Sequence, residues 1–332
     1  MLKVLIVTYY CTNNYGSFLQ AWALGKFFED RNCQVTYWGS ESLELQNVIN
    51  EKNEYRVGRD NALKAARKEF KIDYMCKDAY DLVVVGSDVI WASIKIKEFW
   101  GHNLKGKVYI SYAASMWGMA DSNNIPLKIR KIVEKIRLLL EKKQLKKFSG
   151  ISVRDLRTEE AIQKVTRKEV TRVLDPTFLM ENIPNIKRVI LEEYILVYSY
   201  ALVGEDINPV IEYAKNHDCK ICVIGYRAVW ADYNPTVTPF ELLALFRDAN
   251  AVFTTTFHGT ALSIINHCKF VTYNSNKARQ LLEELKLESR MVDSDNALDL
   301  IEKEIDYTNV DKIIDIKRKA SIDYLEKFIP LK

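Results

Sequence analysis

Residues 251–265 have the sequence AVFTTTFHGTALSII, in which His258 and Gly259 join a β-branched and aromatic run to a run of small and aliphatic residues. The first run predicts a buried strand, and the second predicts a helix that begins at the His-Gly corner. A helix N-terminus attracts anions through its N–H groups and its dipole. An imidazole there can give or take a proton near neutral pH. The stretch therefore predicts an α/β unit with an anion-binding corner, although a structural role is the simpler interpretation of a lone histidine.

The composition is typical of a globular protein with room for two domains. The chain has 332 residues, of which 48% are hydrophobic and 28% are charged. This length suffices for two cores of ordinary size. The formal net charge of +4 is weak, so nucleic acid is not an expected partner.

The six cysteines lie in apolar contexts, and only Cys219 and Cys222 form a C-x-x-C pair. No second pair accompanies them, which disfavours zinc and favours reduced, buried thiols. Met1–Lys3 leads directly into a predicted strand without a signal-peptide pattern, and no apolar run has membrane-spanning length. We therefore expect a soluble, cytoplasmic chain.

Buried strands alternate with helices along the chain, starting with a strand at residues 4–10 and a polar turn at 12–17. This alternation predicts an α/β fold of two Rossmann-like domains with an interdomain cleft, in which ligands bind beyond the carboxyl ends of the strands. We place the domains at residues 1–182 and 183–308, and expect a helix within 309–332 to cross back to the N-terminal domain. No G-x-G-x-x-G is present, so a dinucleotide is not indicated.

A long amphipathic helix is predicted from Pro126 to Phe148. We expect its apolar side to pack on the core, and this side consists of Ile129, Ile132, Val133, Ile136, Leu139 and Leu140. Its other side is basic, with Lys128, Arg130, Lys131, Lys135, Arg137, Lys142, Lys143, Lys146 and Lys147 against Glu134 and Glu141. This basic side has two interpretations, a solvated surface or a peripheral contact with anionic lipid at the inner face of the cell membrane.

Several strand ends resemble, in order and spacing, those of the polysaccharide pyruvyl transferase family. The matching pieces are Asn14–Ser17 with Leu19–Ala21, Val84–Trp91, Ser111–Ser115, Ser152–Asp155, Leu174–Thr177, Thr256–Ser263, and Arg279 with Leu281 and Leu282, continuing to Leu287 and Arg290. The resemblance implies a fold similar to the GT-B glycosyltransferases. It also implies transfer of the enolpyruvyl group of phosphoenolpyruvate onto two sugar hydroxyls, which forms a pyruvate ketal in exopolysaccharide or capsular polysaccharide biosynthesis.

On the donor side, the resemblance makes His258 the candidate acid that protonates the methylene carbon of phosphoenolpyruvate, or a cation that binds its phosphate. The helix start at Gly259 and Thr260 is expected to take phosphate oxygens. Arg154 and Arg279 are candidates for binding the carboxylate and phosphate, with ordinary salt bridges as the alternative. Some family members have Arg-Leu-His where this chain has Thr-Phe-His, so the missing cation must come from elsewhere. Arg279 and Lys277 are the candidates.

On the acceptor side, Asp88 is the candidate base, with a helix N-cap as the alternative. Trp91 is a candidate for stacking on the sugar ring, and the alternative is that it packs in the core. The turn residues Asn14, Tyr15 and Ser17 are candidates for lining the cleft. The alternative is that their polar side chains only stabilise the turn.

The remaining histidines and one turn also have interpretations. His102 is a second candidate, whereas His217 and His267 are expected to be structural. Asp175 and Pro176 are expected to shape a turn. The proposed chemistry needs no metal and no cofactor.

Two other functions fit the same frame. One is a GT-B-like glycosyltransferase that uses a nucleotide sugar, and the other is a non-catalytic carbohydrate-binding relative. A pyruvyl transferase is expected to bind phosphoenolpyruvate and a sugar acceptor. A sugar linked to a polyprenyl carrier is one form of such an acceptor.

Overall fold

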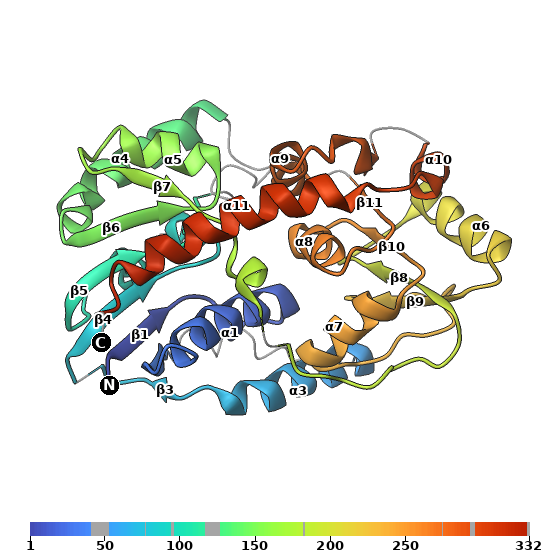
Figure 1. Cartoon of the computed structure of the whole chain (residues 1–332), viewed down its shortest axis with the longest axis horizontal. Coiled ribbons are helices and arrows are strands. Elements are labelled where there is room, and N and C mark those ends of the chain that lie inside the picture. The colour runs from blue at the N-terminus through green and yellow to red at the C-terminus, as the bar shows by residue number, and fades with distance from the viewer. Residues whose placement is uncertain are drawn as a thin grey trace. The chain divides into compact units, whose positions relative to one another are not determined.

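The computed structural model describes the whole chain except residues 41–52, 77, 94–95, 117–126, 182, 274, 293–295 and 331–332. The chain divides into two compact units (Figure 1). The first unit comprises described residues within Met1–Val48, Arg67–Met180 and Ile316–Lys332. The second comprises those within Ile49–Ala66 and Glu181–Asp315.

The first unit contains a parallel sheet of seven strands in the order β3-β2-β1-β4-β5-β6-β7. The strands are β1 Lys3–Val7, β2 Gln34–Trp38, β3 Ile72–Asp73, β4 Tyr80–Val85, β5 Gly106–Ser111, β6 Phe148–Val153 and β7 Val170–Arg172. Its helices are α1 Tyr15–Glu29, α4 Leu127–Leu145 and α5 Leu156–Gln163, with short 3-10 helices at Arg67–Glu69, Ile90–Ala92, Lys97–Trp100 and Pro176–Leu179. Parallel neighbours require crossover connections, which these helices provide.

The second unit contains a parallel sheet of five strands in the order β12-β11-β10-β8-β9. The strands are β8 Tyr194–Tyr198, β9 Lys220–Ile224, β10 Ala251–Thr254, β11 Phe270–Tyr273 and β12 Met291–Val292. Its helices are α3 Glu54–Ala66, α6 Asn208–Asn216, α7 Pro239–Asp248, α8 Phe257–Ile265, α9 Asn276–Glu284 and α10 Ala297–Glu302, with 3-10 helices at Gly204–Ile207 and Glu288–Arg290.

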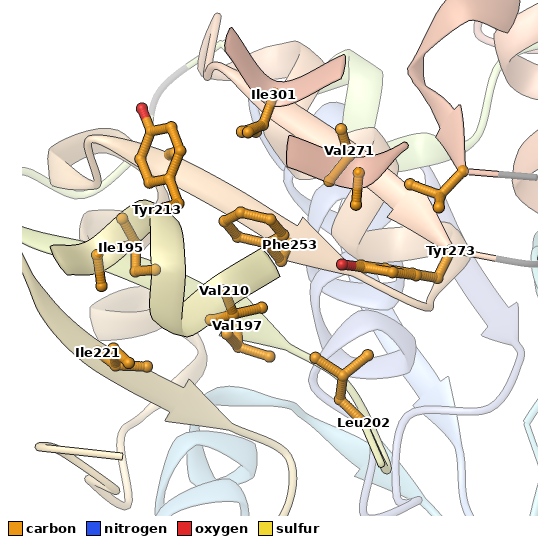
Figure 2. Packing of buried hydrophobic residues seen from close by; sticks show 14 of the residues in the cluster. Ile195, Val197, Leu202, Val210, Tyr213, Ile221, Phe253, Val271, Tyr273 and Ile301 are labelled. Carbon is orange, nitrogen blue, oxygen red and sulfur yellow. The ribbon is translucent and has the colours of Figure 1, made fainter. Parts of the chain in front are cut away.

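The strands of the second unit are buried on both faces. One face packs in a cluster with α6 and α10, in which Val197 and Phe253 lie close to Val210 and Tyr213 (Figure 2). The alternate residues of the same strands face the other way, and Tyr198 contacts Phe246 of α7 with ring centroids 5.6 Å apart. Strands covered on both faces are continuous apolar runs, which is why the sequence predicted them clearly. The two-domain Rossmann-like α/β fold expected from the sequence is confirmed.

The final helix, α11 Tyr307–Glu326, belongs to both units. In the second unit, the Tyr307 hydroxyl donates to the Cys268 carbonyl at 2.6 Å. In the first unit, the Tyr324 hydroxyl donates to the Ser111 carbonyl at 2.8 Å, and the Leu174 N–H donates to Ser321 Oγ at 3.0 Å. The helix therefore begins in one unit and ends in the other.

One segment groups differently from the linear domain boundaries given by the sequence. Helix α3 lies within residues 1–182 but groups with the second unit. The reason is a pair of hydrogen bonds to one loop glycine. The Gly225 N–H donates to the Tyr55 hydroxyl at 2.7 Å, and Arg59 donates to the Gly225 carbonyl at 3.1 Å.

The prediction that the apolar side of α4 packs on the core was wrong. Ile129, Ile132, Val133, Ile136, Leu139 and Leu140 are exposed. The helix packs instead through Leu138 and Leu145, and through Arg137, whose guanidinium lies 5.4 Å from the Trp100 ring centroid. Within the described residues, no helix combines the length and apolarity needed to cross a membrane.

Candidate functional site

Each sheet has a point where the chain reverses its direction of strand addition. In the first unit this point lies between β1 and β4, and in the second between β8 and β10. In open parallel sheets, the carboxyl ends of the two strands at this point diverge and leave a crevice in which ligands bind. The candidates Asn14, Ser17 and Asp88 follow β1 and β4, and His258 follows β10. These four candidates therefore lie at the switch point of their own unit, whereas Arg154 follows β6 and Arg279 lies on α9 after β11.

In the first unit, Asp88 joins the segments that follow the two switch-point strands. Its carboxylate accepts a hydrogen bond from Ser17 Oγ at 2.9 Å and one from the Val89 N–H at 2.7 Å. Its backbone φ is +76°, a left-handed conformation that is uncommon for a residue other than glycine and that occurs often at functional sites. The bond to the Val89 N–H resembles the N-cap contact that was the alternative role for Asp88. However, the Asp88 carboxylate also contacts Ser17 and Arg154.

Arg154 lies between two carboxylates at the end of β6. It donates to Asp175 Oδ2 at 2.7 Å and lies 3.5 Å from Asp88 Oδ1. Burial opposes the guanidinium charge, but Asp175 and Asp88 more than offset this, so the pKa of Arg154 is raised. Arg154 therefore forms salt bridges within its own unit, which was the alternative to donor binding, because two carboxylates already balance its charge.

The loop after β4 is packed tightly, which explains its small residues. A Cβ on Gly86 would lie 2.0 Å from the Tyr112 carbonyl oxygen, and Gly86 has a φ of +131°. Ser87 donates to Gln20 Oε1 at 2.6 Å, and Thr8 Oγ1 donates to the Ser87 carbonyl at 2.8 Å. Only glycine fits at position 86, and the hydrogen bonds around Ser87 position the following carboxylate of Asp88.

Four residues of this cluster were not among the sequence candidates: Thr8, Tyr9, Gln20 and, as an ion-pair partner, Asp175. Tyr9 is partly exposed two residues after the end of β1, and burial and the charge of Asp88 raise the pKa of its phenol. Asp175 shapes its turn as expected, by accepting from Thr177, and in addition pairs with Arg154. The available signal was position, because Tyr9 lies near the carboxyl end of the strand predicted at residues 4–10, at the sheet edge where ligands bind.

The other acceptor-side candidates have mainly structural contacts. Trp91 has no exposed surface, stacks on Trp100 with centroids 5.1 Å apart, and donates to the Phe99 carbonyl at 2.8 Å. It therefore offers no face to a sugar, and the core alternative is correct. Asn14 caps α1 by accepting from the Gly16 N–H at 2.8 Å, and Tyr15 is 2% exposed.

In the second unit, the strand, corner and helix predicted for residues 251–265 are confirmed as β10 and α8. His258 is the second residue of α8 and is 8% exposed. Its ring lies edge-on to Phe257 with centroids 5.2 Å apart. A Cβ on Gly259 would lie 2.0 Å from Thr254 Oγ1 and 2.8 Å from Thr256 Oγ1, so glycine is required for this tight corner.

The N–H groups of Gly259 and Thr260 have partners inside the corner. The Gly259 N–H donates to Thr256 Oγ1 at 2.9 Å, which makes Thr256 the N-cap of α8. The Thr260 N–H donates to the Thr256 carbonyl at 3.1 Å, and Thr260 Oγ1 bonds with Thr272 Oγ1 at 2.9 Å. These two residues therefore do not present their N–H groups to a phosphate in this structure, in contrast to the expectation.

The remaining cationic candidates lie on α9. Arg279 and Lys277 are partly exposed there, and the Arg279 N–H donates to the carbonyl of Ser275, the N-cap of that helix. The first turn of α9 thus brings two cations to the segment that follows β11, the neighbour of β10.

The other histidines form local pairs. His102 bonds with Glu141 at 2.8 Å and with Gln144 at 3.1 Å, which anchors α4. His217 pairs with Glu302 at 2.6 Å, and His267 pairs with Asp311 at 2.9 Å. The structural interpretation of His217 and His267 is correct, and the contacts of His102 are structural as well.

The cysteines are all free thiols. Cys222 lies buried in β9, and burial raises its pKa to about 12. Cys219, at the other end of the C-x-x-C, is partly exposed just before the strand. In the part of the chain that the structure describes, no group of three or more His, Cys, Asp or Glu side chains is arranged to hold a metal ion.

Comparison with known proteins gives one family match and a set of similar folds. The family model of the polysaccharide pyruvyl transferases matches residues 14–277, a range that contains Asp88, Arg154 and His258. No curated protein sequence matches the chain.

Three solved structures illustrate the likeness in fold. UGT89C1 of Arabidopsis thaliana, complexed with UDP, has 10% identity over 99% of this chain and 100% of its own, with a TM-score of 0.54. A putative UDP-N-acetylglucosamine 2-epimerase from Listeria monocytogenes has 11% identity over 97% and 92%, with a TM-score of 0.51. The UDP-GlcNAc 2-epimerase of Methanocaldococcus jannaschii has 12% identity over 96% and 92%, with a TM-score of 0.50. At these identities the likeness shows the fold, that of the GT-B enzymes.

Proposed function

The chain belongs to the polysaccharide pyruvyl transferase family, and from this premise we propose that it transfers the enolpyruvyl group of phosphoenolpyruvate to two hydroxyls of a sugar. The product is a pyruvate ketal in surface polysaccharide biosynthesis. One observation carries the proposal beyond the family match. Within the matched range, a carboxylate and an imidazole each lie directly after a strand at the switch point of a sheet. These are the side chains that acid–base chemistry on a bound ligand requires.

The proposed reaction needs two proton transfers at the sugar and one at the donor. A proton added to the methylene carbon of phosphoenolpyruvate makes the central carbon electrophilic. One sugar hydroxyl forms a C–O bond to that carbon and loses its proton, and the C–O bond to phosphate then breaks. The second hydroxyl adds to the same carbon and loses its proton. The products are the ketal and inorganic phosphate. Of the two protons that the sugar hydroxyls lose, one replaces the proton added to the methylene carbon and the other leaves with phosphate.

His258 is the proposed acid, because imidazole is the side chain whose ordinary pKa lies nearest to neutral pH. Its place in the first turn of α8, beside the positive end of the helix dipole, suits a step that involves an anionic donor. Arg279 and Lys277 are the proposed cations for the carboxylate and phosphate. They replace Arg154 in that role, because two carboxylates already balance the charge of Arg154.

Asp88 is the proposed base for the sugar hydroxyls. Ser17 and Arg154 hold its two oxygens from different segments, which fixes the direction of the carboxylate. The partly exposed ring of Tyr9 is the proposed aromatic contact for the sugar in place of buried Trp91. The acceptor is proposed to be a sugar, with polyprenyl-linked forms included, and no metal or organic cofactor is invoked.

The proposal is tested by phosphate release from phosphoenolpyruvate in the presence of a panel of sugar acceptors. We expect release that depends on both substrates, and a loss of about 10²–10⁴-fold in His258→Ala with an unchanged melting temperature. The matched control is His267→Ala in the same unit, because His267 is exposed and paired with Asp311. Undiminished release in His258→Ala would contradict the role of this residue.

A nucleotide-sugar glycosyltransferase is the second candidate function, and the fold neighbour that holds UDP favours it. Thermal stabilisation separates the two candidates. Phosphoenolpyruvate stabilises a pyruvyl transferase, whereas UDP or GDP stabilises a glycosyltransferase. A third outcome, sugar binding that is unchanged in His258→Ala without phosphate release, would identify a non-catalytic carbohydrate-binding relative.

A further inference from the structure

Helix α4 has six large aliphatic side chains on its solvent side, which we call the aliphatic stripe. They are between 40% exposed (Val133) and 73% exposed (Leu140). The stripe consists of Ile129, Ile132, Val133, Ile136, Leu139 and Leu140. Single exposed aliphatic residues are ordinary, but a continuous set along one helix side indicates an interaction surface.

The orientation of α4 is fixed by specific contacts on its opposite side. Leu138 and Leu145 are buried, and Arg137 lies over the Trp100 ring. Glu141 and Gln144 both bond to His102. These positions follow one another at helical spacing, so they define one face of the helix and leave the aliphatic stripe on the face turned away from the unit.

Positive charge accompanies the aliphatic stripe. Lys135, Lys142 and Lys143 are all exposed. Lys135 and Lys142 are seven residues apart, which places them on the same side of the helix, next to the stripe. Among the described side chains of α4, the one acidic residue is Glu141, and it is paired with His102. An exposed aliphatic face bordered by lysines complements a surface that is apolar inside and anionic at its boundary.

We propose that α4 docks the protein onto an anionic lipid surface. The aliphatic stripe enters the boundary between headgroups and acyl chains, and the helix lies parallel to the surface. The lysine stems extend beside the stripe and place their ammonium groups among the lipid phosphates. This inference does not depend on the proposed reaction, since it rests on the helix alone.

A second copy of the chain is a less suitable occupant of the same surface. A symmetric contact through the aliphatic stripe brings two copies of α4 together, and with them the exposed lysines of both. Like charges brought close in a contact oppose association, and the described part of α4 offers no unpaired carboxylate to balance them. An anionic lipid surface has no such conflict.

The test is flotation of the full chain with lipid vesicles. One set contains phosphatidylcholine alone, and the other contains phosphatidylcholine with phosphatidylglycerol. We expect the protein to float with the anionic vesicles, with at least about tenfold weaker partitioning to the neutral ones and a decrease at high salt. The variant Ile132→Ser/Ile136→Ser/Leu140→Ser is expected to lose about tenfold or more of the binding to anionic vesicles.

The control variant is Leu191→Ser/Val229→Ser, which removes two highly exposed aliphatic residues of the second unit and is expected to float like the wild type. The variant Lys135→Gln/Lys142→Gln/Lys143→Gln tests the charge, and it should weaken binding to anionic vesicles only. Thermal melting verifies that each variant is folded. Equal flotation with both lipid mixtures, no flotation at all, or undiminished flotation of the triple serine variant would overturn the proposal. A dimer that becomes a monomer in that variant would assign the stripe to a second copy instead.

Discussion

Arg154 shows how buried ion pairs determine the role of a charged residue. An arginine at the carboxyl end of a strand is a natural candidate for binding an anionic donor, but Asp175 and Asp88 surround this one. Its structural effect is to hold Oδ1 of the Asp88 carboxylate, while Ser17 donates to Oδ2. Arg154 is therefore a positioning residue, and the sequence could not show this because its partners lie 66 and 21 residues away.

The ion pair gives a prediction for stability. Asp175→Asn should lower the free energy of unfolding by about 3 kcal/mol, because Arg154 loses its partner at 2.7 Å in a buried place. The matched control is Glu159→Gln, whose partner Arg172 lies at 3.0 Å but is well exposed, and it should cost less than about 1 kcal/mol. Denaturant unfolding of both variants measures the difference. Equal costs would mean that burial does not control the strength of these pairs.

Short-range patterns around His258 were predicted well, and contacts through space were not. The sequence specified the strand, the corner and the helix, because these depend on neighbouring residues. It did not specify that Thr256 takes the Gly259 N–H, because several threonines precede the helix and each could act as the cap. The burial of Trp91 likewise depends on Trp100, which a separate 3-10 helix provides.

At the scale of elements, α4 shows the limit of periodicity. Its aliphatic residues recur at helical spacing, and the sequence predicted the helix correctly but oriented it the wrong way. Periodicity shows that a helix has two different sides, whereas only its partners determine which side is buried. Here an arginine, a glutamate and a glutamine find specific partners in Trp100 and His102.

This orientation predicts opposite outcomes for two residues that are two positions apart. Leu138→Ala should cost about 2–5 kcal/mol in unfolding free energy, because Leu138 is 5% exposed. Ile136→Ala should change it by no more than about 0.5 kcal/mol, because Ile136 is 52% exposed. Chemical denaturation compares the two variants directly. A larger cost at Ile136 than at Leu138 would restore the orientation expected from the sequence.

At the scale of the whole chain, the order of segments does not match their grouping in space. The sequence placed the division near residue 182, and in the structure Met180 belongs to the first unit and Glu181 to the second. However, α3 joins the second unit through Gly225, and the end of α11 joins the first. The return of the last helix could be anticipated from its length. The grouping of α3 could not, because its composition fits either unit and two hydrogen bonds to one loop decide it.

The two halves of α11 allow each unit to be tested from within a single helix. Tyr324 is 4% exposed, and its hydroxyl donates to the Ser111 carbonyl in the first unit, whereas the Tyr307 hydroxyl donates to the Cys268 carbonyl in the second. Tyr324→Phe should cost about 1 kcal/mol, the lower end for a buried hydrogen bond, because Ser152 Oγ also donates to the Ser111 carbonyl.

The strands that lose amide protection in each variant identify the unit that each half of α11 stabilises. In hydrogen exchange, Tyr324→Phe should lower the protection of amides in β5 and β6, and Tyr307→Phe should lower that of β10 and β11. Each variant serves as the control for the other, since both remove one hydroxyl from the same helix. Loss of protection in the same strands for both variants would contradict the division of α11 between two units, because a helix held by separate contacts transmits each loss first to the sheet that it touches.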